Sequence, residues 1–336
     1  GSYDLALAKI GSGTLTLSGA NTYGGDTTVN AGTLALGAAN VIPNGAGKGD
    51  VTVASGATLN LAGRNETING LSGSGTVDDA SATNVTFTVG DNDATSTFAG
   101  VIQDSSTGAL SLTKIGSGTL TLGGINTYSG DTTVSAGTLK LGAADVIPGG
   151  TGHGILTVAS GAMFDLAGYS EWINSLSGGG VVDNISAADA TLYVAGGAGT
   201  SNEFSGVLQN SDTGKLRLVV ECGNSLTLSG ANTYSGDTVV CIGSKLALGA
   251  ANVIPNGAGK GNVHINMGGI LDLNGFDETI NGLMDSSGYV DNTSSTSDAT
   301  LTVGDNDATS SFSGILRNTG SYDLALAKIG SGTLTL

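Results

Sequence analysis

Charged and aromatic side chains are scarce in this 336-residue chain, and each scarcity narrows the class of protein. Only 12% of the residues are charged, against roughly 25% in an average globular domain, and only 4% are aromatic. Three prolines beside 58 glycines exclude a collagen, which needs abundant proline and a strict Gly-X-Y period. A disordered Gly/Ser linker is excluded too, because 39% of the residues are apolar and alternate with Thr and Ser. The composition therefore indicates a β-protein with many turns.

Basic residues are also few, which argues against nucleic acid as a partner. The 11 Lys and Arg are spread along a chain of net charge −17, whereas a phosphate-binding surface needs clustered cations. The same sign of charge disfavours anionic lipid, and no apolar run approaches the roughly 18 residues of a transmembrane segment. Because the chain starts without an initiator Met or a charged leader, we expect an internal piece of a longer protein.

The sequence repeats itself with a period of about 105 residues. Residues 9–17 (KIGSGTLTL) recur at 114–122 and 328–336, and a degraded copy occupies 220–228. We therefore divide the chain into internal repeats at 9–113, 114–219 and 220–327, followed by the start of a fourth at 328–336.

A longer period is present as well, because residues 1–17 are identical to residues 320–336. The simplest interpretation is a parent protein that repeats a block of three units. A sequence closed on itself by design is the alternative.

Short strand patterns separated by Gly, Asn, Asp and Ser fill each repeat, and no segment has a helical period. In the first repeat we expect strands at 14–17, 27–29, 33–36, 51–53, 58–61, 66–68, 85–89, 97–102 and 110–114. The phrase GTLTL returns in altered form after about 19 and then about 25 residues, which matches one coil of a parallel β-helix. A propeller blade would need about 40 residues.

We therefore predict an all-β fold, a right-handed parallel β-helix (β-solenoid) that is one continuous segment over residues 1–336 and uncapped at both ends. Coils about 4.8 Å apart would number roughly 14 to 16. Inward side chains are expected to stack as aliphatic ladders, namely Leu15, Leu17, Leu34, Leu36, Leu59 and Leu61. Asn21, Asn126 and Asn232 are expected to tolerate left-handed backbone and to satisfy buried turn amides.

The phrases at residues 114–122, 126–130, 131–134 and 137–141 resemble the passenger-associated β-strand repeats of autotransporters. The resemblance implies a β-helix exported by type V secretion through a C-terminal outer-membrane barrel, then displayed on or shed from a Gram-negative-like cell. In that family the repeat is thought to assist transport and folding outside the cell. The third copy departs most, since residues 220–225 read VECGNS where the others read KIGSGT.

That departure carries the only two cysteines, Cys222 and Cys241, at nearly equivalent points of successive coils. Adjacent coils separate Cα atoms by about 4.8 Å, which lies inside the range for a disulfide. We predict a Cys222–Cys241 disulfide in an oxidising exterior; the alternative is two inert buried thiols.

Two acidic turns are weak calcium candidates through Asp91, Asp93, Asp305 and Asp307. The middle repeat reads AGGA at 195–198 instead, and the G-G-x-G-x-D pattern of calcium-binding β-rolls is missing. A solvated turn is the favoured interpretation, and we expect no metal site and no cofactor.

No catalytic residue is expected, because neither G-x-S-x-G nor H-E-x-x-H occurs and neither His153 nor His264 has a nucleophile signature nearby. The only tryptophan, Trp172, is interpreted as a half-buried packing residue, with a sugar-stacking platform as the alternative.

Two functions remain for such a chain. The first is a structural segment of a secreted bacterial cell-surface filament or stalk, and the alternative is the shaft of an autotransporter adhesin that binds host or neighbouring-cell surfaces. A glycan-processing β-helix enzyme is a remote third. A binding shaft should have one face whose side chains differ between repeats, whereas a pure spacer should not.

The expected partners are other copies of the chain itself, by continuation or head-to-tail stacking into a fibre, together with cell-surface glycans or proteins. The expected location is extracellular.

Overall fold

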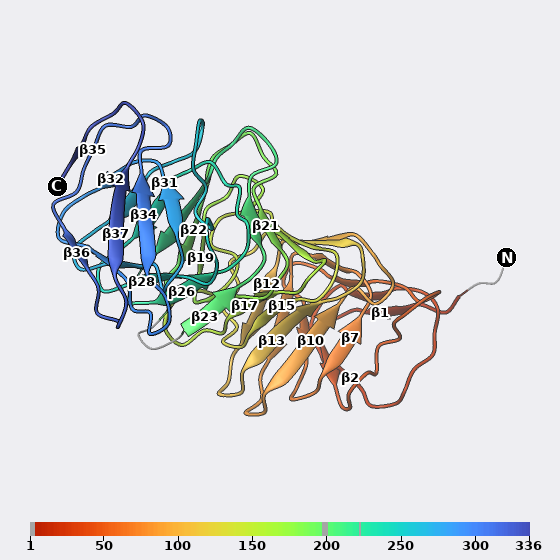
Figure 1. Ribbon diagram of the computed structural model, residues 1–336. Helices are drawn as coiled ribbons and strands as arrows, with labels where there is room; N and C mark the ends of the chain where they lie inside the picture. The colour runs from red at the N-terminus through yellow and green to blue at the C-terminus, as the bar shows by residue number, and fades with distance from the viewer. Residues whose placement is uncertain (1–3, 197–200, 222) are drawn as a thin grey trace. The chain divides into compact units, whose positions relative to one another are not determined.

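The chain is built from short strands and turns (Figure 1). The computed structural model describes residues 4–196, 201–221 and 223–336, and it contains no helix in those ranges. None of these residues therefore belongs to a helix that could cross a membrane. Two compact units are present: residues 1–148 with 152–165, and residues 149–151 with 166–336. The fold is the predicted parallel β-solenoid, with about 13 turns instead of the 14 to 16 expected.

Three sheets of parallel strands make up the first unit. Sheet A orders β1 (Leu7–Lys9), β3 (Thr27–Val29), β5 (Val51–Val53), β8 (Leu71–Gly73), β11 (Ser96–Phe98), β14 (Thr119–Leu122), β16 (Thr138–Leu141) and β18 (Met163–Asp165). Sheet B orders β2 (Thr14–Leu17), β4 (Thr33–Leu36), β6 (Thr58–Asn60), β9 (Thr76–Asp79) and β12 (Val101–Asp104). Sheet C orders β7 (Glu66–Ile68), β10 (Val85–Val89), β13 (Leu110–Lys114), β15 (Thr132–Val134) and β17 (Leu156–Val158).

The second unit repeats this arrangement with three further sheets. Sheet D orders β19 (Glu171–Ile173), β22 (Ala190–Val194), β25 (Leu216–Val220), β27 (Thr238–Val240), β29 (Val263–Ile265) and β32 (Leu283–Met284). Sheet E orders β23 (Ser201–Phe204), β26 (Ser225–Leu228), β28 (Lys245–Leu248), β30 (Ile270–Asp272), β33 (Tyr289–Asp291) and β36 (Ile315–Arg317). Sheet F orders β31 (Glu278–Ile280), β34 (Ala299–Val303) and β37 (Leu324–Lys328). The remaining strands are β20 (Leu176–Ser177), the pair β21 (Val181–Asp183) and β24 (Val207–Gln209), and the pair β35 (Ser310–Ser311) and β38 (Leu334–Thr335).

Alternation of Leu with Thr places one apolar ladder on the inner side of each sheet. In sheet B, Leu34 lies in register with Leu59, and Leu59 with Val77; all three are fully buried. Each coil thus buries its apolar face against its neighbours only, which makes stability nearly additive along a solenoid. The predicted ladder is confirmed for Leu34, Leu36, Leu59 and Leu61, whereas Leu15 and Leu17 are only partly buried.

Most of the strands predicted for the first repeat have the observed bounds, but the segment 97–102 was wrongly read as one strand. The structure divides it into β11 and β12, because the chain turns at Ala99 and Gly100. A Cβ at Gly100 would overlap the carbonyl oxygen of Gly75 in the preceding coil, so only glycine allows the two coils to approach there.

The repeated asparagines bridge neighbouring coils. Asn126 accepts a hydrogen bond from the Ile102 amide at 2.8 Å and donates to the Val146 carbonyl at 2.6 Å. Asn232 is placed the same way one repeat later. Contrary to the prediction, the amides that they bind lie in β12 and β24 and not in turns, and their backbones are not left-handed. Asn21 donates to the carbonyls of Gly19 at 3.0 Å and Val41 at 2.8 Å.

Candidate functional site

A buried lysine fixes the first turn of the repeated motif. Lys114 ends β13 on the inner side of sheet C and is 1% exposed. Its ammonium donates to the carbonyls of Ile115 at 2.6 Å, Gly116 at 2.8 Å and, one coil later, Ala136 at 3.3 Å. Burial lowers the pKa of Lys114, and the carboxylate of Asp93 partly opposes that change. The lysine of the motif therefore has a structural role. We call such a buried charged side chain, which holds a turn by hydrogen bonds to backbone groups, a turn staple.

The staple is present in the first repeat and replaced in the third. The Lys9 ammonium donates to the Gly11 carbonyl at 2.7 Å and to the Ala31 carbonyl at 2.9 Å. In the third repeat Val220 stands at this position, in register with Val240. The departure seen in the sequence thus exchanges a polar staple for an apolar contact.

A buried glutamate holds a second turn in the same fashion. Glu66 accepts hydrogen bonds from the amides of Val41 at 3.1 Å and Ile42 at 2.7 Å, and Glu278 accepts from the equivalent amides of the third repeat. Both side chains are 1% exposed. Burial raises the pKa of each carboxyl to about 7, against the amide donors that favour the charged form. These carboxyls are turn staples with no oxygen directed to solvent.

The acidic turns named as weak calcium candidates already have partners. Asp93 accepts from the Ser117 amide at 2.6 Å, and Asp307 from the equivalent serine amide at 2.6 Å. This hydrogen bond is the main reason why the pKa of each carboxyl lies below its ordinary value. Asp91 and Asp305 stand two residues earlier in the same turns. Within the described ranges, no three His, Cys, Asp or Glu side chains are grouped to hold a metal ion.

The predicted disulfide involves Cys222, which lies outside the described residues, so the Cys222–Cys241 pair stays a prediction. Cys241 directly follows β27 and is partly buried. Its Sγ lies 3.8 Å from Oε1 of Glu221, on the preceding coil.

The outward ladder of sheet C consists of threonine. The strand register aligns Thr67, Thr88, Thr113, Thr133 and Thr157 in one line across five strands. All five are partly exposed. Threonine suits a pleated, half-buried surface. A uniform row of such small side chains has neither protrusions nor hollows for a ligand to contact.

The outward ladder of sheet D has different chemistry. Its register aligns, in order, Trp172, Tyr193, Val219, Val239, His264 and Met284, which we call the D stripe. Other repeats carry Thr or Ser at these positions, apart from alanines at the position of Val219. One face of the second unit therefore differs from the rest of the solenoid at consecutive coils.

The large side chains of the D stripe cover the small ones. Trp172 and Tyr193 stack with ring centroids 4.1 Å apart and planes at 10°, and Trp172 keeps 39% of its surface exposed. Val219 and Val239 lie between Tyr193 and His264 in the ladder and are only 2% and 3% exposed. Trp172 is thus half-buried, as predicted, but it packs on an aromatic partner on the outer surface.

A small hollow of about 210 Å³ lies beside the D stripe, where β22, β25 and β27 begin. Lys215 and Arg217 line it with exposed side chains, together with Asp189 and Asp237; we call it the basic hollow. Each carboxylate uses one oxygen to hold the backbone: Asp189 accepts from the Lys215 amide at 2.7 Å, and Asp237 from the Asn262 amide at 2.8 Å.

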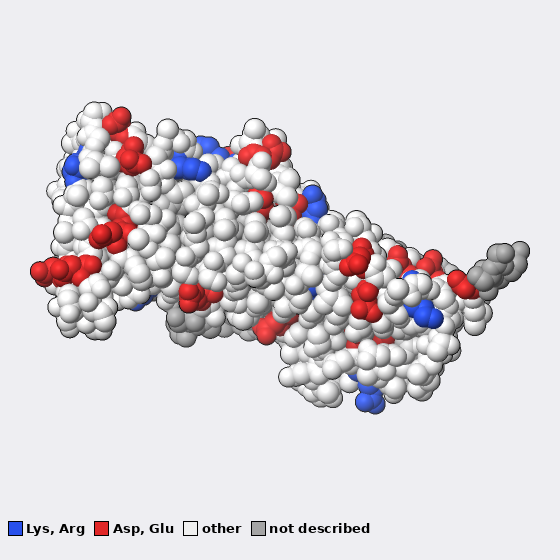
Figure 2. Space-filling model, turned by 45° about the vertical axis from the view of Figure 1, so that its right-hand side comes forward, with Lys and Arg blue, Asp and Glu red and all other residues white. Residues whose placement is uncertain are grey.

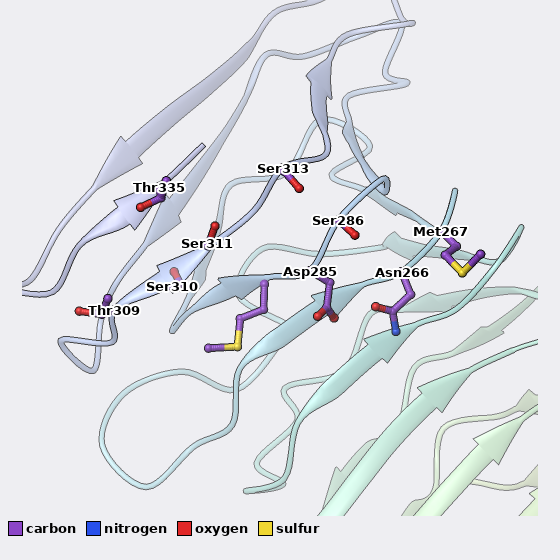
Figure 3. Close-up of a pocket in the computed structure, with 10 residues that line it drawn as sticks. Asn266, Met267, Asp285, Ser286, Thr309, Ser310, Ser311, Ser313 and Thr335 are labelled. Carbon is purple, nitrogen blue, oxygen red and sulfur yellow. The ribbon is translucent and has the colours of Figure 1, made fainter.

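A larger groove of about 860 Å³ adjoins the far end of the D stripe (Figure 3). Most of its lining side chains carry hydroxyl groups, namely Ser286, Thr309, Ser310, Ser311, Ser313 and Thr335. Figure 3 shows Asp285 between Met267 on one side and the threonines on the other. The carboxylate of Asp285 lies 2.8 Å from Nδ1 of His264, while Nε2 of the same ring lies 3.8 Å from Asp237.

The turn at Asp285 is strained. Its φ is 84°, at a position where the first repeat has Gly73 with a φ of 102°. A non-glycine residue in this region costs about 1–3 kcal/mol and persists only where the surroundings hold it.

The Ser310 hydroxyl in the same groove is buried without a hydrogen-bond partner among the described residues. At the equivalent position of the first repeat, the Ser96 hydroxyl accepts a hydrogen bond from the Leu71 amide at 3.1 Å.

On the face drawn in Figure 2, acidic and basic side chains stand singly or in small groups among uncharged ones. A broad patch of one sign, as nucleic acid would need, is not visible there.

The D stripe was missed from the sequence, although a signal was present. The residues that stay the same between repeats, such as the inward leucines, dominate the pattern of the sequence. The informative positions are the outward ones, where Trp172, Tyr193 and His264 replace threonines.

Comparison with known proteins agrees with the fold. Residues 7–36, 112–141 and 223–240 match the passenger-associated-transport-repeat family. The chain is also 32% identical over 232 residues to the adhesin BmaC autotransporter of Brucella suis biovar 1 (strain 1330). That alignment covers 67% of this chain but only 6% of the relative. No solved structure matches.

Proposed function

Because the chain belongs to the autotransporter passenger family, we propose that it is the shaft of a surface adhesin that makes contact along one side of its second unit. The relative from Brucella is named an adhesin, which supports this class of function. Export across the outer membrane by type V secretion is part of the proposal.

The D stripe carries the proposal. Inward ladders recur from repeat to repeat, as any solenoid requires, and so do the turn staples, except that Val220 replaces the lysine in the third repeat. Outward positions are free to vary, yet sheet C keeps threonine while sheet D replaces it in register at successive coils. The strained Asp285 beside His264 adds a feature that folding alone does not need. Exposed aromatic and charged side chains on a rigid scaffold are typical of a recognition surface.

Adhesion of protein-coated beads to cell monolayers and to bacterial lawns tests this function. The stripe variant Trp172→Thr, Tyr193→Thr and His264→Thr restores residues that the fold accepts in the first repeat. A matched control, Thr88→Ser with Thr133→Ser, changes the sheet C ladder. Beads with the native chain and with the control should adhere, and beads with the stripe variant should not. Equal adhesion by all three, with circular dichroism showing intact folds, would reject a binding side.

A structural filament or stalk is the second candidate, and one observation favours it. The sequence 1–17 returns at 320–336, and there Lys328 donates to the carbonyls of Ile329 and Gly330 as Lys9 does to those of Ile10 and Gly11. The same local structure thus recurs in phase, as a fibre of one long chain or of stacked copies requires. Electron micrographs of the parent protein should contain continuous fibres; isolated blunt rods would speak against this candidate.

The proposal contains no chemical step. Both ring nitrogens of His264 face carboxylates, at 2.8 and 3.8 Å, so neither faces a hydroxyl nucleophile. Nδ1 of His153 lies 3.1 Å from the Tyr128 carbonyl oxygen. Depolymerisation of any member of a polysaccharide panel by the purified protein would contradict a purely adhesive role.

A further inference from the structure

The basic residues of this acidic chain are almost all engaged by its own backbone or carboxylates. Of the 11, those with such contacts are Lys9, Lys48, Lys114, Lys140, Lys245, Lys260, Arg317 and Lys328. The side chains of Arg64, Lys215 and Arg217 form no hydrogen bond or ion pair with the described residues. Two of these three cations stand together in the basic hollow.

The backbone around the two cations is held by the same hydrogen bond in the first repeat, where neither cation is present. There, Asn84 holds the Ala109 amide at 2.9 Å, as Asp189 holds that of Lys215 in the second unit. Lys215 stands where the first repeat has Ala109, and Arg217 where it has Ser111. The fold therefore does not need either cation. Lys215 directly precedes β25 and Arg217 lies within it, and both side chains are exposed two residues apart, about 7 Å.

The hollow suits a single anionic group set among hydroxyls. Arg and Lys together can bind the two oxygens of a carboxylate by charge-assisted hydrogen bonds. The second oxygen of Asp189 can accept a hydrogen bond from a neutral hydroxyl group, and the hydroxyls of Thr191 and Ser235 can donate or accept one. The second oxygen of Asp237 also faces Nε2 of His264, at 3.8 Å. The same carboxylates, within a chain of net charge −17, repel a dense polyanion such as nucleic acid.

An apolar edge completes the surface. Tyr193 follows Thr191 by two residues on the same face of β22, and Trp172 stacks on it from the preceding coil. A sugar next to the anionic residue can therefore lay its C–H groups against an aromatic pair. The hollow is smaller than the roughly 300–1,000 Å³ of drug-sized sites, so it takes one sugar residue of a longer glycan.

We propose that the basic hollow binds a carboxylated sugar residue of a cell-surface glycan, with Arg217 and Lys215 on the carboxylate. This inference rests on the proposed adhesive function and names its ligand class.

Isothermal titration with defined oligosaccharides tests the inference. The acidic probes are a hyaluronan hexasaccharide and 3′-sialyllactose, and their neutral counterparts are chitohexaose and lactose. At least one acidic probe should bind about tenfold or more tightly than its neutral counterpart, and the binding should weaken as salt rises. Equal affinity for acidic and neutral probes, or no binding of any, would overturn the proposal.

Matched variants locate the site. Arg217→Ser and Lys215→Ala restore residues of the first repeat and should each weaken acidic-probe binding about tenfold. Arg64→Ser removes an exposed cation from a hollow in the first unit and should leave the affinity unchanged. Equal losses in all three would reveal a general charge effect and reject the site. Binding to phosphatidylglycerol vesicles without saccharide binding would reject it in favour of lipid.

The bead assay distinguishes a wrong ligand from a wrong function. If coated beads adhere and the stripe variant does not, yet Arg217→Ser adheres fully, the ligand assignment fails while the adhesive function stands. If native beads do not adhere at all, the function fails as well.

Discussion

The indole of Trp172 stacks on the phenol ring of Tyr193, one coil further along sheet D, with centroids 4.1 Å apart. Near-parallel aromatic pairs contribute about 0.5–1.5 kcal/mol beyond the area they bury. The double variant Trp172→Thr with Tyr193→Thr should therefore be more stable, by about 1 kcal/mol, than the sum of the single losses implies. Urea unfolding of the four proteins measures this coupling. Strict additivity would mean that the stacked rings do not interact energetically.

Lys114 should be worth far more to stability than an exposed lysine. The variant Lys114→Val, which copies the third repeat, leaves three turn carbonyls without their donor. We expect a loss of about 2 kcal/mol, with faster amide hydrogen exchange confined to residues 112–141. Lys215→Ala is the control, because it removes an exposed lysine that has no hydrogen bond or ion pair with the described residues, and it should change stability by no more than about 0.5 kcal/mol.

Stability should fall as the pH rises from about 4.5 to about 7. Glu66 and Glu278 have pKa values raised from 4.5 to about 7 by burial, so the folded state favours their protonated forms. Their contribution is complete below pH 4.5 and is lost as the pH passes 7, up to about 3 kcal/mol for each carboxyl. Melting temperatures across this window, in the native chain and in the variant Glu66→Gln with Glu278→Gln, measure the effect. The variant should respond much less to pH; an unchanged slope would assign the effect to other groups.

Asp93 and Asp307 act outside this window. The pKa of each is lowered by a serine amide, so any stabilisation from them is lost only as the pH falls below the ordinary carboxyl range. One series of melting temperatures against pH therefore separates the effect of the two glutamates from that of the two aspartates.

Calcium should not stabilise the protein. The carboxylates of Asp93 and Asp307 each accept a hydrogen bond from a serine amide one coil later. One carboxylate oxygen in each acidic turn is therefore already bound to the backbone. Adding millimolar Ca²⁺ or a chelator should leave the melting temperature unchanged. A calcium-dependent rise that Asp91→Asn or Asp305→Asn abolishes would restore the metal interpretation.

Much of the fold was predictable because strand, turn and repeat signals agree locally. The leucines at 34, 36, 59 and 61 alternate with small polar residues, and that period of two places them inside whatever the wider context. The coil spacing followed from the return of one phrase after about 19 and 25 residues.

Other features could not be predicted, since they depend on the neighbouring coil. The break at Gly100 is imposed by the carbonyl of Gly75, about one coil earlier. The charged Lys114 and Glu66 look like surface residues in sequence and are buried, because turn carbonyls and amides of adjacent coils satisfy them.

The D stripe was not predicted from the sequence for another reason. Outward positions carry no periodic constraint, so a tryptophan there looks like an isolated exception until register pairs it with the outward residues of successive coils.

The staples reach only one coil along the chain. Lys114 contacts Ala136, 22 residues later, and Glu66 contacts the amide of Val41, 25 residues earlier. Every coil can therefore close as soon as its immediate neighbour exists, without waiting for distant sequence. If the proposed export delivers the chain to the cell exterior one end first, each finished coil opposes backward movement of the chain and offers the edge on which the next coil forms.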